Sequence, residues 1–332
     1  MTGRYDFYPM LLRPAYRRYL WGGERLARLF ARAEQGGVIA ESWECSDRDE
    51  GPTFIDNGSY ANRMLFDLHG MLGEELAGRR VERMPLLIKL LDAERDLSIQ
   101  VHPDERRAPL FRGEAKTEAW VVMAAMSGAF VYAGFGERIS EERLREAIDK
   151  ETLPSLLHRI DVEEGDAIFI PGGTVHAIGA GCVIFEVQQN SDTTYRLFDY
   201  GRRDTKGKRR KLHVKEALAT ADLSVCAGGR MCPAVREKNS ACEREELISC
   251  PYFRIERVWV YDRMDCGFAE KSFTYYFIAG GGGRAETDHG EYDLSYGRSY
   301  LFPYGLKRWQ LKRGEGSLCL LRVSLQSVGG EG

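Results

Sequence analysis

The segment EEGDAIFIPGGTVHAI (163–178) indicates the fold class. An apolar run, AIFI (167–170), leads into the turn residues PGG (171–173), and a second short apolar run follows around His176. Short strands separated by a Gly/Pro turn are typical of antiparallel β structure. The later segment YDLSYGRSYLFPYGLKRWQL (292–311) repeats the order of strand, glycine, strand, proline and turn, but has no histidine at the matching place. The chain is therefore predicted to contain two related β units.

Further short strands surround both segments, and no strand–helix–strand alternation interrupts them. This pattern predicts a mainly β fold of two jelly-roll barrels with short helical insertions. Residues 1–225 are expected to form the barrel with the candidate site, and residues 226–332 a second β domain without metal ligands. The predicted strands are PLLIKLLDA (85–93), LSIQVH (97–102), EAWVVMAAM (118–126), AFVYAGF (129–135), CVIFEVQQ (182–189), FRIERVWVYD (253–262), SFTYYFIAG (272–280), KRWQLK (307–312) and SLCLLRVSL (317–325).

Two stretches of the first unit change to helical periodicity. NRMLFDLHGMLGEELAG (62–78) places its apolar residues on one helix face, with a break expected at Gly70. The second predicted helical segment lies near 137–158, where Ser140 is the expected N-cap, followed by two acidic residues of the first turn.

Composition excludes several classes of function. The chain has 332 residues, 43% hydrophobic and 29% charged, with a net charge of −3, so no broad attraction to nucleic acid or to an anionic membrane is expected. No stretch approaches the roughly 20 apolar residues that span a bilayer, and no signal peptide is recognised. The expected compartment is the cytoplasm, and any bound phosphate requires a local basic pocket.

Residues capable of metal chemistry occur at strand spacing. Gln100 and His102 are two residues apart, as are Lys116 and Glu118, so each pair lies on one face of its strand. A closed barrel brings these strands together with that of His176 and points alternate side chains inward. Imidazole nitrogens, a carboxylate and an amide oxygen are acceptable ligands for zinc or a similar divalent metal.

Four blocks of sequence carry a resemblance to a known family. They resemble, in order and spacing, the short bacterial form of type I mannose-6-phosphate isomerases (phosphomannose isomerases) of the cupin superfamily. The resemblance implies two cupin-type barrels, one Zn²⁺ per chain, and reversible isomerisation of mannose 6-phosphate and fructose 6-phosphate through an enediol. The blocks are PLLIKLLDAERDLSIQVHPD (85–104), AKTEAWVV (115–122), EGDAIFIPGGTVHAIGAG (164–181) and EVQQNSDTTYRLFDY (186–200).

The same resemblance implies roles for individual residues. It implies that Arg196 is catalytic and that Lys116 lines the pocket beside the metal. Lys89 and Ser98, expected on adjacent strands, are candidates to bind the phosphate. The general base stays open among Glu186, Asp192 and Lys116. The implied zinc ligands are Gln100, His102, Glu118 and His176, and the implied substrate-binding residues are Lys89, Ser98, Glu186 and Asp192.

Other functions of the same barrel stay open. Two histidines and a glutamate also suit the iron of a cupin oxygenase, and many cupins are non-catalytic sugar-binding modules. Gln100, Lys116 and the pair Asp192/Arg196 favour the isomerase, although that pair is also a candidate structural ion pair. The basic run GRRDTKGKRRKLH (201–213) indicates a solvated loop near the site rather than a nucleic-acid contact. The expected partner is a sugar phosphate, with neither nucleic acid nor membrane; the oligomeric state stays open, a monomer being preferred.

Overall fold

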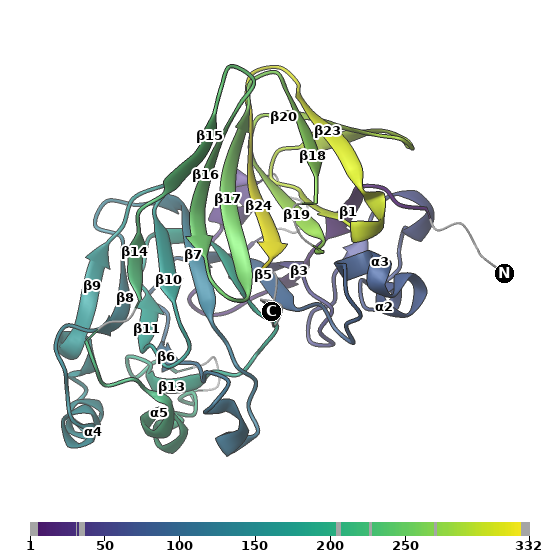
Figure 1. The fold of residues 1–332 in the computed structure, drawn as a ribbon. Coiled ribbons are helices and arrows are strands. Elements are labelled where there is room, and N and C mark those ends of the chain that lie inside the picture. The colour runs from purple at the N-terminus through teal and green to yellow at the C-terminus, as the bar shows by residue number, and fades with distance from the viewer. Residues whose placement is uncertain are drawn as a thin grey trace, which may run out of the picture.

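The computed structural model describes residues 6–30, 32, 37–203, 207–225, 228–268 and 271–326. Its strands form four sheets, which make two β-sandwiches packed back to back (Figure 1). Each sandwich has one long and one short sheet, and the two long sheets share the largest apolar core of the described chain.

The first sandwich holds most of the residues before 225. Its seven-stranded sheet is ordered β14 (Gly229–Met231), β10 (Ala167–Ile170), β7 (Glu118–Ala125), β12 (Cys182–Gln189), β5 (Leu86–Ala93), β3 (Glu41–Cys45) and β2 (Ala15–Arg17). Its five-stranded sheet is ordered β13 (Tyr195–Phe198), β6 (Ile99–Val101), β11 (His176–Ile178), β8 (Phe130–Phe135) and β9 (Leu157–Asp161).

The second sandwich is built mainly from the last third of the chain. Its eight-stranded sheet is ordered β15 (Ala234–Lys238), β16 (Cys242–Ser249), β17 (Phe253–Val260), β24 (Leu318–Leu325), β19 (Thr274–Gly280), β22 (Ser299–Phe302), β1 (Met10–Arg13) and β4 (Phe54–Ile55). Its four-stranded sheet is ordered β18 (Arg263–Gly267), β23 (Arg308–Arg313), β20 (Gly282–Thr287) and β21 (Gly290–Ser295).

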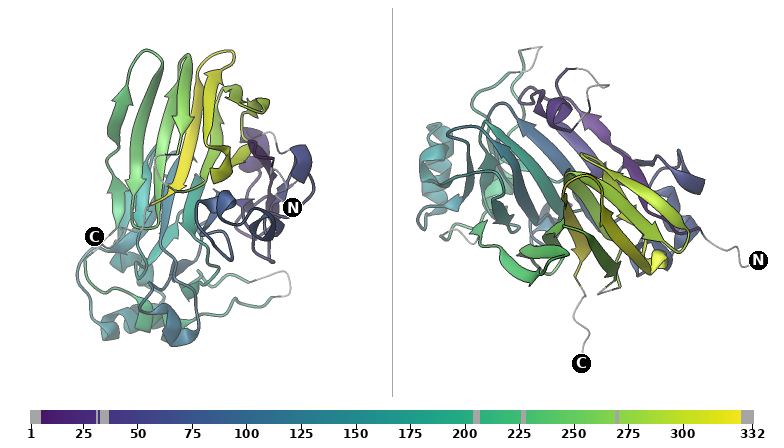
Figure 2. Two further views of the ribbon diagram at one scale, coloured as in Figure 1. Left: turned by 45° about the vertical axis from the view of Figure 1, so that its right-hand side comes forward. Right: turned by 90° about the horizontal axis from the view of Figure 1, so that it is seen from above.

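The two sandwiches exchange strands. Strand β1 pairs with β22, with Met10 opposite Leu301, so a strand near the N-terminus completes the sheet of the C-terminal part. Figure 2 shows this segment in purple beside the yellow-green C-terminal strands. Strand β14 in turn pairs with β10 of the first sandwich. Strands from each side of residue 225 therefore pair within a sheet of the other unit. The division of the chain into two domains at residue 225 stays a prediction.

Strand alternation positions the site. On β12, Phe185 faces the core between the two long sheets and packs 5.6 Å from the ring of Phe277, whereas Glu186 faces the inside of the first sandwich. On β5, Leu90 and Lys89 divide in the same way. Because both faces of this sheet are covered, its strands read as nearly continuous apolar runs in which the few polar residues stand out.

The helices differ from prediction in their ends. The helical segment at 62–78 is present as α2 (Asp67–Leu72) and α3 (Glu74–Ala77), but the break is at Gly73, whose φ is 55°, and not at Gly70. Ser140 caps α4 (Glu141–Asp149) as predicted, its side chain accepting a hydrogen bond from Arg143 N. The remaining elements are α1 (Arg25–Leu29), α5 (Val214–Thr220), η2 (Gly58–Tyr60), η3 (Ala108–Phe111), η4 (Leu153–Leu156) and η5 (Tyr304–Leu306).

The helix predicted near 137–158 is too long. Helix α4 ends at Asp149, and Glu151 then adopts a positive φ of 56°. The separate turn η4 follows, and strand β9 begins at Leu157. Within the described ranges no helix is long and apolar enough to cross a membrane.

Candidate metal centre and substrate cavity

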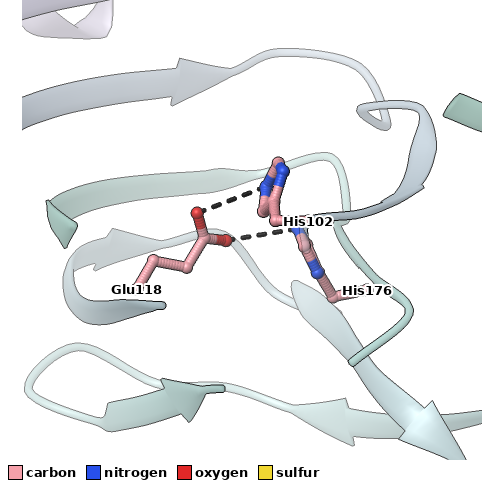
Figure 3. Close-up of side chains that lie close together, drawn as sticks. All are labelled: His102, Glu118 and His176. Carbon is pink, nitrogen blue, oxygen red and sulfur yellow. Dashed lines mark ion pairs between the residues drawn. The ribbon is translucent and has the colours of Figure 1, made fainter. Parts of the chain in front are cut away.

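Three ionisable side chains meet inside the first sandwich (Figure 3). Glu118 and His176 begin β7 and β11, and His102 follows β6 directly. The carboxylate oxygens of Glu118 lie 3.4 Å from His102 Nε2 and 3.2 Å from His176 Nε2. All three residues are buried, and their candidate ligand atoms lie within 4.8 Å of one another. Strands β6, β7 and β11 therefore bring three of the four predicted ligands to one point.

The backbone orients both imidazoles. His102 Nδ1 lies 2.8 Å from the carbonyl oxygen of Thr193, and His176 Nδ1 lies 2.8 Å from that of Thr174. A carbonyl only accepts, so each Nδ1 carries the proton and each Nε2 turns its lone pair toward Glu118. Burial, followed by the charge of Lys116, lowers the pKa of His102 to about 3, and burial lowers the pKa of His176. Both rings are thus neutral near pH 7, as metal ligands must be.

Glu118 supplies the negative charge. Burial alone would raise its pKa, but Lys116, His102 and His176 outweigh burial and hold the pKa well below its usual range. Lys116 Nζ lies 2.7 Å from one oxygen, yet neither buried oxygen accepts a hydrogen bond from the residues that the structure describes. Ligands about 2.0–2.2 Å from a tetrahedral zinc ion are roughly 3.3 Å apart. Two neutral nitrogens and a carboxylate at this spacing fit a divalent cation.

The side chain of Gln100 lies beside this cluster. His176 lies opposite Gln100 in the β6–β11 ladder, and the amide nitrogen of Gln100 lies 3.5 Å from His102 Nε2 and 3.4 Å from His176 Nε2. A half-turn of the amide presents its oxygen to the same point. Its role as a fourth ligand stays a prediction.

A cavity of about 440 Å³ opens between the two sheets of the first sandwich. His102 lies just behind its wall, 1% exposed. The cavity collects nine of the ten residues predicted for the site, although their roles stay predictions: Lys89, Ser98, Gln100, Lys116, Glu118, His176, Glu186, Asp192 and Arg196.

The inner wall of the cavity carries a buried charge pair. Lys89 Nζ lies 3.5 Å from a Glu186 oxygen and 3.9 Å from a Glu41 oxygen, and stands 5.0 Å over the Trp43 ring. Burial, followed by the charge of Glu118, raises the pKa of Glu186. Trp120 Nε1 donates a hydrogen bond to Glu186 at 3.1 Å. Glu186 is therefore a carboxyl whose proton affinity is increased by its surroundings.

The expectation that Lys89 and Ser98 lie on adjacent strands is wrong. Strands β5 and β6 belong to different sheets, so the two residues reach the cavity from opposite walls. The two runs are close in sequence, and periodicity shows which face of a strand a residue occupies but not which sheet the strand joins.

Arg196 lies on the same wall as Ser98. Its Nε donates to Ser98 Oγ at 3.1 Å, and its Nη1 donates to the carbonyl oxygen of Lys211 at 3.2 Å. Burial, followed by the neighbouring charge of Arg210, lowers the pKa of Arg196, but a guanidinium remains charged at neutral pH. Among the described residues Asp192 makes no ion pair with Arg196, so the structural ion pair considered above is not observed.

Comparison with known proteins places this site in a family. Residues 10–120 match the model of "Phosphomannose isomerase type I, catalytic domain". Mannose-6-phosphate isomerase ManA of Bacillus subtilis is 33% identical over 316 residues, which cover 92% of this chain and 96% of the relative. The chain belongs to the type I phosphomannose isomerase family.

Solved structures of phosphomannose isomerases share the fold. The crystal structure of mannose 6-phosphate isomerase from Bacillus subtilis has a TM-score of 0.87 at 29% identity and covers 95% of this chain and 99% of its own. A mannose 6-phosphate isomerase described as bound with zinc and yttrium has a TM-score of 0.75 at 18% identity, with 96% and 99% covered. The predicted mainly β, cupin-type fold is confirmed.

Several cavity residues were missed from the sequence. Tyr19, Trp21 and Glu41 line the cavity from the N-terminal segment, and Arg210 lines it from the basic run. Glu41 could have been found, because its two-residue spacing from Trp43 on β3 puts both side chains on one face of the strand. Arg210 had only its place in a charged run, part of which, 204–206, lies outside the described residues.

Asp199 anchors the basic run at the cavity. Its carboxylate lies 2.5 Å from both Arg202 and Arg210. Burial would raise the pKa of Asp199, but the hydrogen bonds from Arg210 and Arg202 outweigh it and lower the pKa. Because folding lowers the pKa of Asp199, its ion pairs with Arg202 and Arg210 stabilise the fold at pH values above the pKa of the unfolded chain, about 3.9. This contribution is lost as the pH falls through the pKa of Asp199 in the folded protein.

Asp199→Asn is accordingly expected to reduce the free energy of unfolding at pH 7 by about 1–3 kcal/mol. The difference from the parent should shrink as the pH falls below about 4. Urea denaturation at pH 7 and at a pH below about 4 measures the difference in the free energy of unfolding. Asp161→Asn is the control, because that carboxylate pairs with Arg159 but is 79% exposed. An equal difference between Asp199→Asn and the parent at the two pH values would contradict a lowered pKa of Asp199.

Proposed function

We propose that the chain is a mannose-6-phosphate isomerase that interconverts mannose 6-phosphate and fructose 6-phosphate. The observation that carries this proposal is a single cavity in which a candidate metal centre, two fixed cations and a buried carboxyl of raised proton affinity meet. Aldose–ketose isomerisation needs these three functions, because a proton moves between C1 and C2 while negative charge develops on a substrate oxygen.

The chain's own residues suit the charge that develops. Lys116 and Arg196 present fixed positive charge to one cavity, where preorganised charge stabilises a developing oxyanion. Gln100, His102, Glu118 and His176 would hold zinc, one ion per chain. The bound metal supplies a Lewis acid that polarises the substrate.

We propose Glu186 as the group that carries the proton. Lys116 is engaged by Glu118 at 2.7 Å, and Asp192 lies exposed at the cavity mouth. Glu186 is buried, lines the cavity and has a pKa raised by burial, so it is the best suited of the three candidates to accept and return a proton.

The phosphate is proposed to lie at the end of the cavity formed by Ser98 and Arg210. The Lys89 ammonium is already flanked by the carboxylates of Glu186 and Glu41, which disfavour a second anion there. Arg210 pairs with one carboxylate, that of Asp199, but the neighbouring Arg196 makes no ion pair with the described residues, so this wall offers an uncompensated guanidinium and the Ser98 hydroxyl. Charge-assisted hydrogen bonds of this kind hold a phosphate strongly.

The test is turnover of purified, zinc-loaded protein. Mannose 6-phosphate should give fructose 6-phosphate, and glucose 6-phosphate serves as the comparison substrate. Oxygen uptake in the same assay addresses the oxygenase alternative. Absence of isomerisation in protein with a full metal complement would reject the proposal. A cytoplasmic location and a monomeric state are part of the proposal, to be tested by fractionation and by sedimentation.

A further inference from the structure

The second sandwich has a charged cavity of its own, of about 360 Å³. Among the residues that the structure describes, its lining holds four guanidinium groups and two carboxylates, in a protein whose net charge is −3. No part of the isomerase chemistry uses it. Its polar lining residues are Arg236, Arg244, Arg254, Arg322, Glu246, Glu256, Ser272, Thr274 and Ser324.

This cavity occupies the place that corresponds to the substrate cavity. The strand order β10-β7-β12-β5-β3 of the first sandwich is matched by β22-β19-β24-β17-β16 in the second. In the first, Glu186 lies opposite Lys89 and Trp120.

At the matching ladder position of the second sandwich, Arg322 lies opposite Glu256 and Tyr276. The buried acid and base have thus exchanged strands. The fold therefore forms the same kind of cavity twice, with arginines where the first has its carboxyl.

Several buried donors of the second cavity lack an acceptor. Arg322 Nε, Arg244 Nε and Thr274 Oγ1 are buried and make no hydrogen bond to the part of the chain that the structure describes. The Arg322 side chain is 9% exposed, and its contact with Glu256 is long, at 3.4 Å. The Nε of Arg244 also approaches Glu256 only to 3.4 Å. Unsatisfied buried donors are costly, so this group of residues favours an added acceptor with several oxygens.

We propose that this cavity binds a small phosphomonoester through its tetrahedral oxyanion. Guanidinium groups donate in a planar fork that matches phosphate oxygens, and the Thr274 hydroxyl adds a further donor. The volume lies in the range of small-molecule sites. The site is separate from the catalytic cavity and does not rest on the proposed isomerase activity.

The test uses inorganic phosphate as the probe, titrated calorimetrically into full-length, zinc-loaded protein. The double variant Arg236→Gln/Arg254→Gln changes two arginines at the rim, with side chains 51% and 29% exposed, and leaves the buried Arg322 in place. It should weaken one class of phosphate binding by roughly tenfold or more. Arg196→Ala, in the catalytic cavity, should leave that class intact.

Glu246→Gln supplies the opposite arm. Its carboxylate pairs with both Arg236 and Arg254, at 2.5 and 3.2 Å, so its neutralisation should tighten phosphate binding several-fold, to an extent that salt reduces. A purely structural ion network predicts instead that both substitutions lower the melting temperature and neither alters the phosphate isotherm. That result, or a single binding class abolished by Arg196→Ala, overturns the proposal.

Discussion

Removal of the bound metal by a chelator should reduce turnover of mannose 6-phosphate by at least about a thousandfold, and added zinc should restore it. The expectation follows from the cluster at Glu118, whose buried oxygens accept no hydrogen bond from the described residues. In the metal-free protein Lys116, 2.7 Å away, still balances the Glu118 carboxylate, so the fold should survive chelation and the loss should be reversible. Activity and zinc content, measured on the same samples, should rise together to one ion per chain.

A variant separates loss of the metal from damage by the chelator. Glu118→Gln keeps the size of the side chain but removes the only negative charge among the proposed ligands, so zinc should bind weakly and restore little activity. Glu146→Gln on α4 is the matched control, because that carboxylate is 60% exposed and, within the described residues, pairs with Lys150 alone. Full activity of protein shown to be free of metal would remove the basis of the proposed chemistry.

The strands that alternate or run continuously apolar were predictable, because sheet burial leaves a periodic signal. The runs at 85–93, 118–126 and 182–189 are strands within one or two residues of the predicted ends. The strands before residue 57 were not predicted, since β1 and β2 are short and their pairing is with distant partners. The sequence of a strand does not show which distant strand it pairs with, so the strand exchange between the sandwiches could not be predicted.

The helix break at Gly73 has a local cause that sequence alone left undecided. Both Gly70 and Gly73 are able to break a helix, but only Gly73 adopts a positive φ, 55°, where the chain turns into α3. With the turn at this place, Leu68, Leu72 and Leu76 all lie in the core.

The metal cluster was the most predictable part of the site. A two-residue spacing puts Gln100 and His102 on one face whatever the partner strand is, and a closed barrel then brings that face inward. The other walls depend on which sheet each strand joins. Lys89 and Ser98 were expected side by side and lie across the cavity instead. Arg210 enters the site from a loop, where no periodicity exists to place a side chain.

Arg196→Ala is expected to lower kcat by about a hundred- to a thousandfold while zinc content and the unfolding midpoint stay near those of the parent. Arg196 is fixed by Ser98 Oγ at 3.1 Å and by the Lys211 carbonyl at 3.2 Å, and within the described residues its Nη2 makes no hydrogen bond. A guanidinium held this way meets developing negative charge without rearranging, which is the condition for strong electrostatic stabilisation. The loss should appear in kcat more than in KM, because the interaction strengthens in the transition state.

Two further variants define what Arg196 contributes. Arg196→Lys keeps the charge but loses the fork that binds Ser98 and Lys211, so it should recover only part of the lost rate. Arg143→Ala on α4 removes an arginine that is 48% exposed and should leave kcat unchanged. If Arg196→Ala instead raised KM with kcat intact, the guanidinium would bind ground state and transition state equally, and its place would be the phosphate end of the cavity beside Arg210. Zinc lost together with activity would indicate that Arg196 supports the cavity wall, since Ser98 contacts Gln100 at 3.4 Å as well as Arg196.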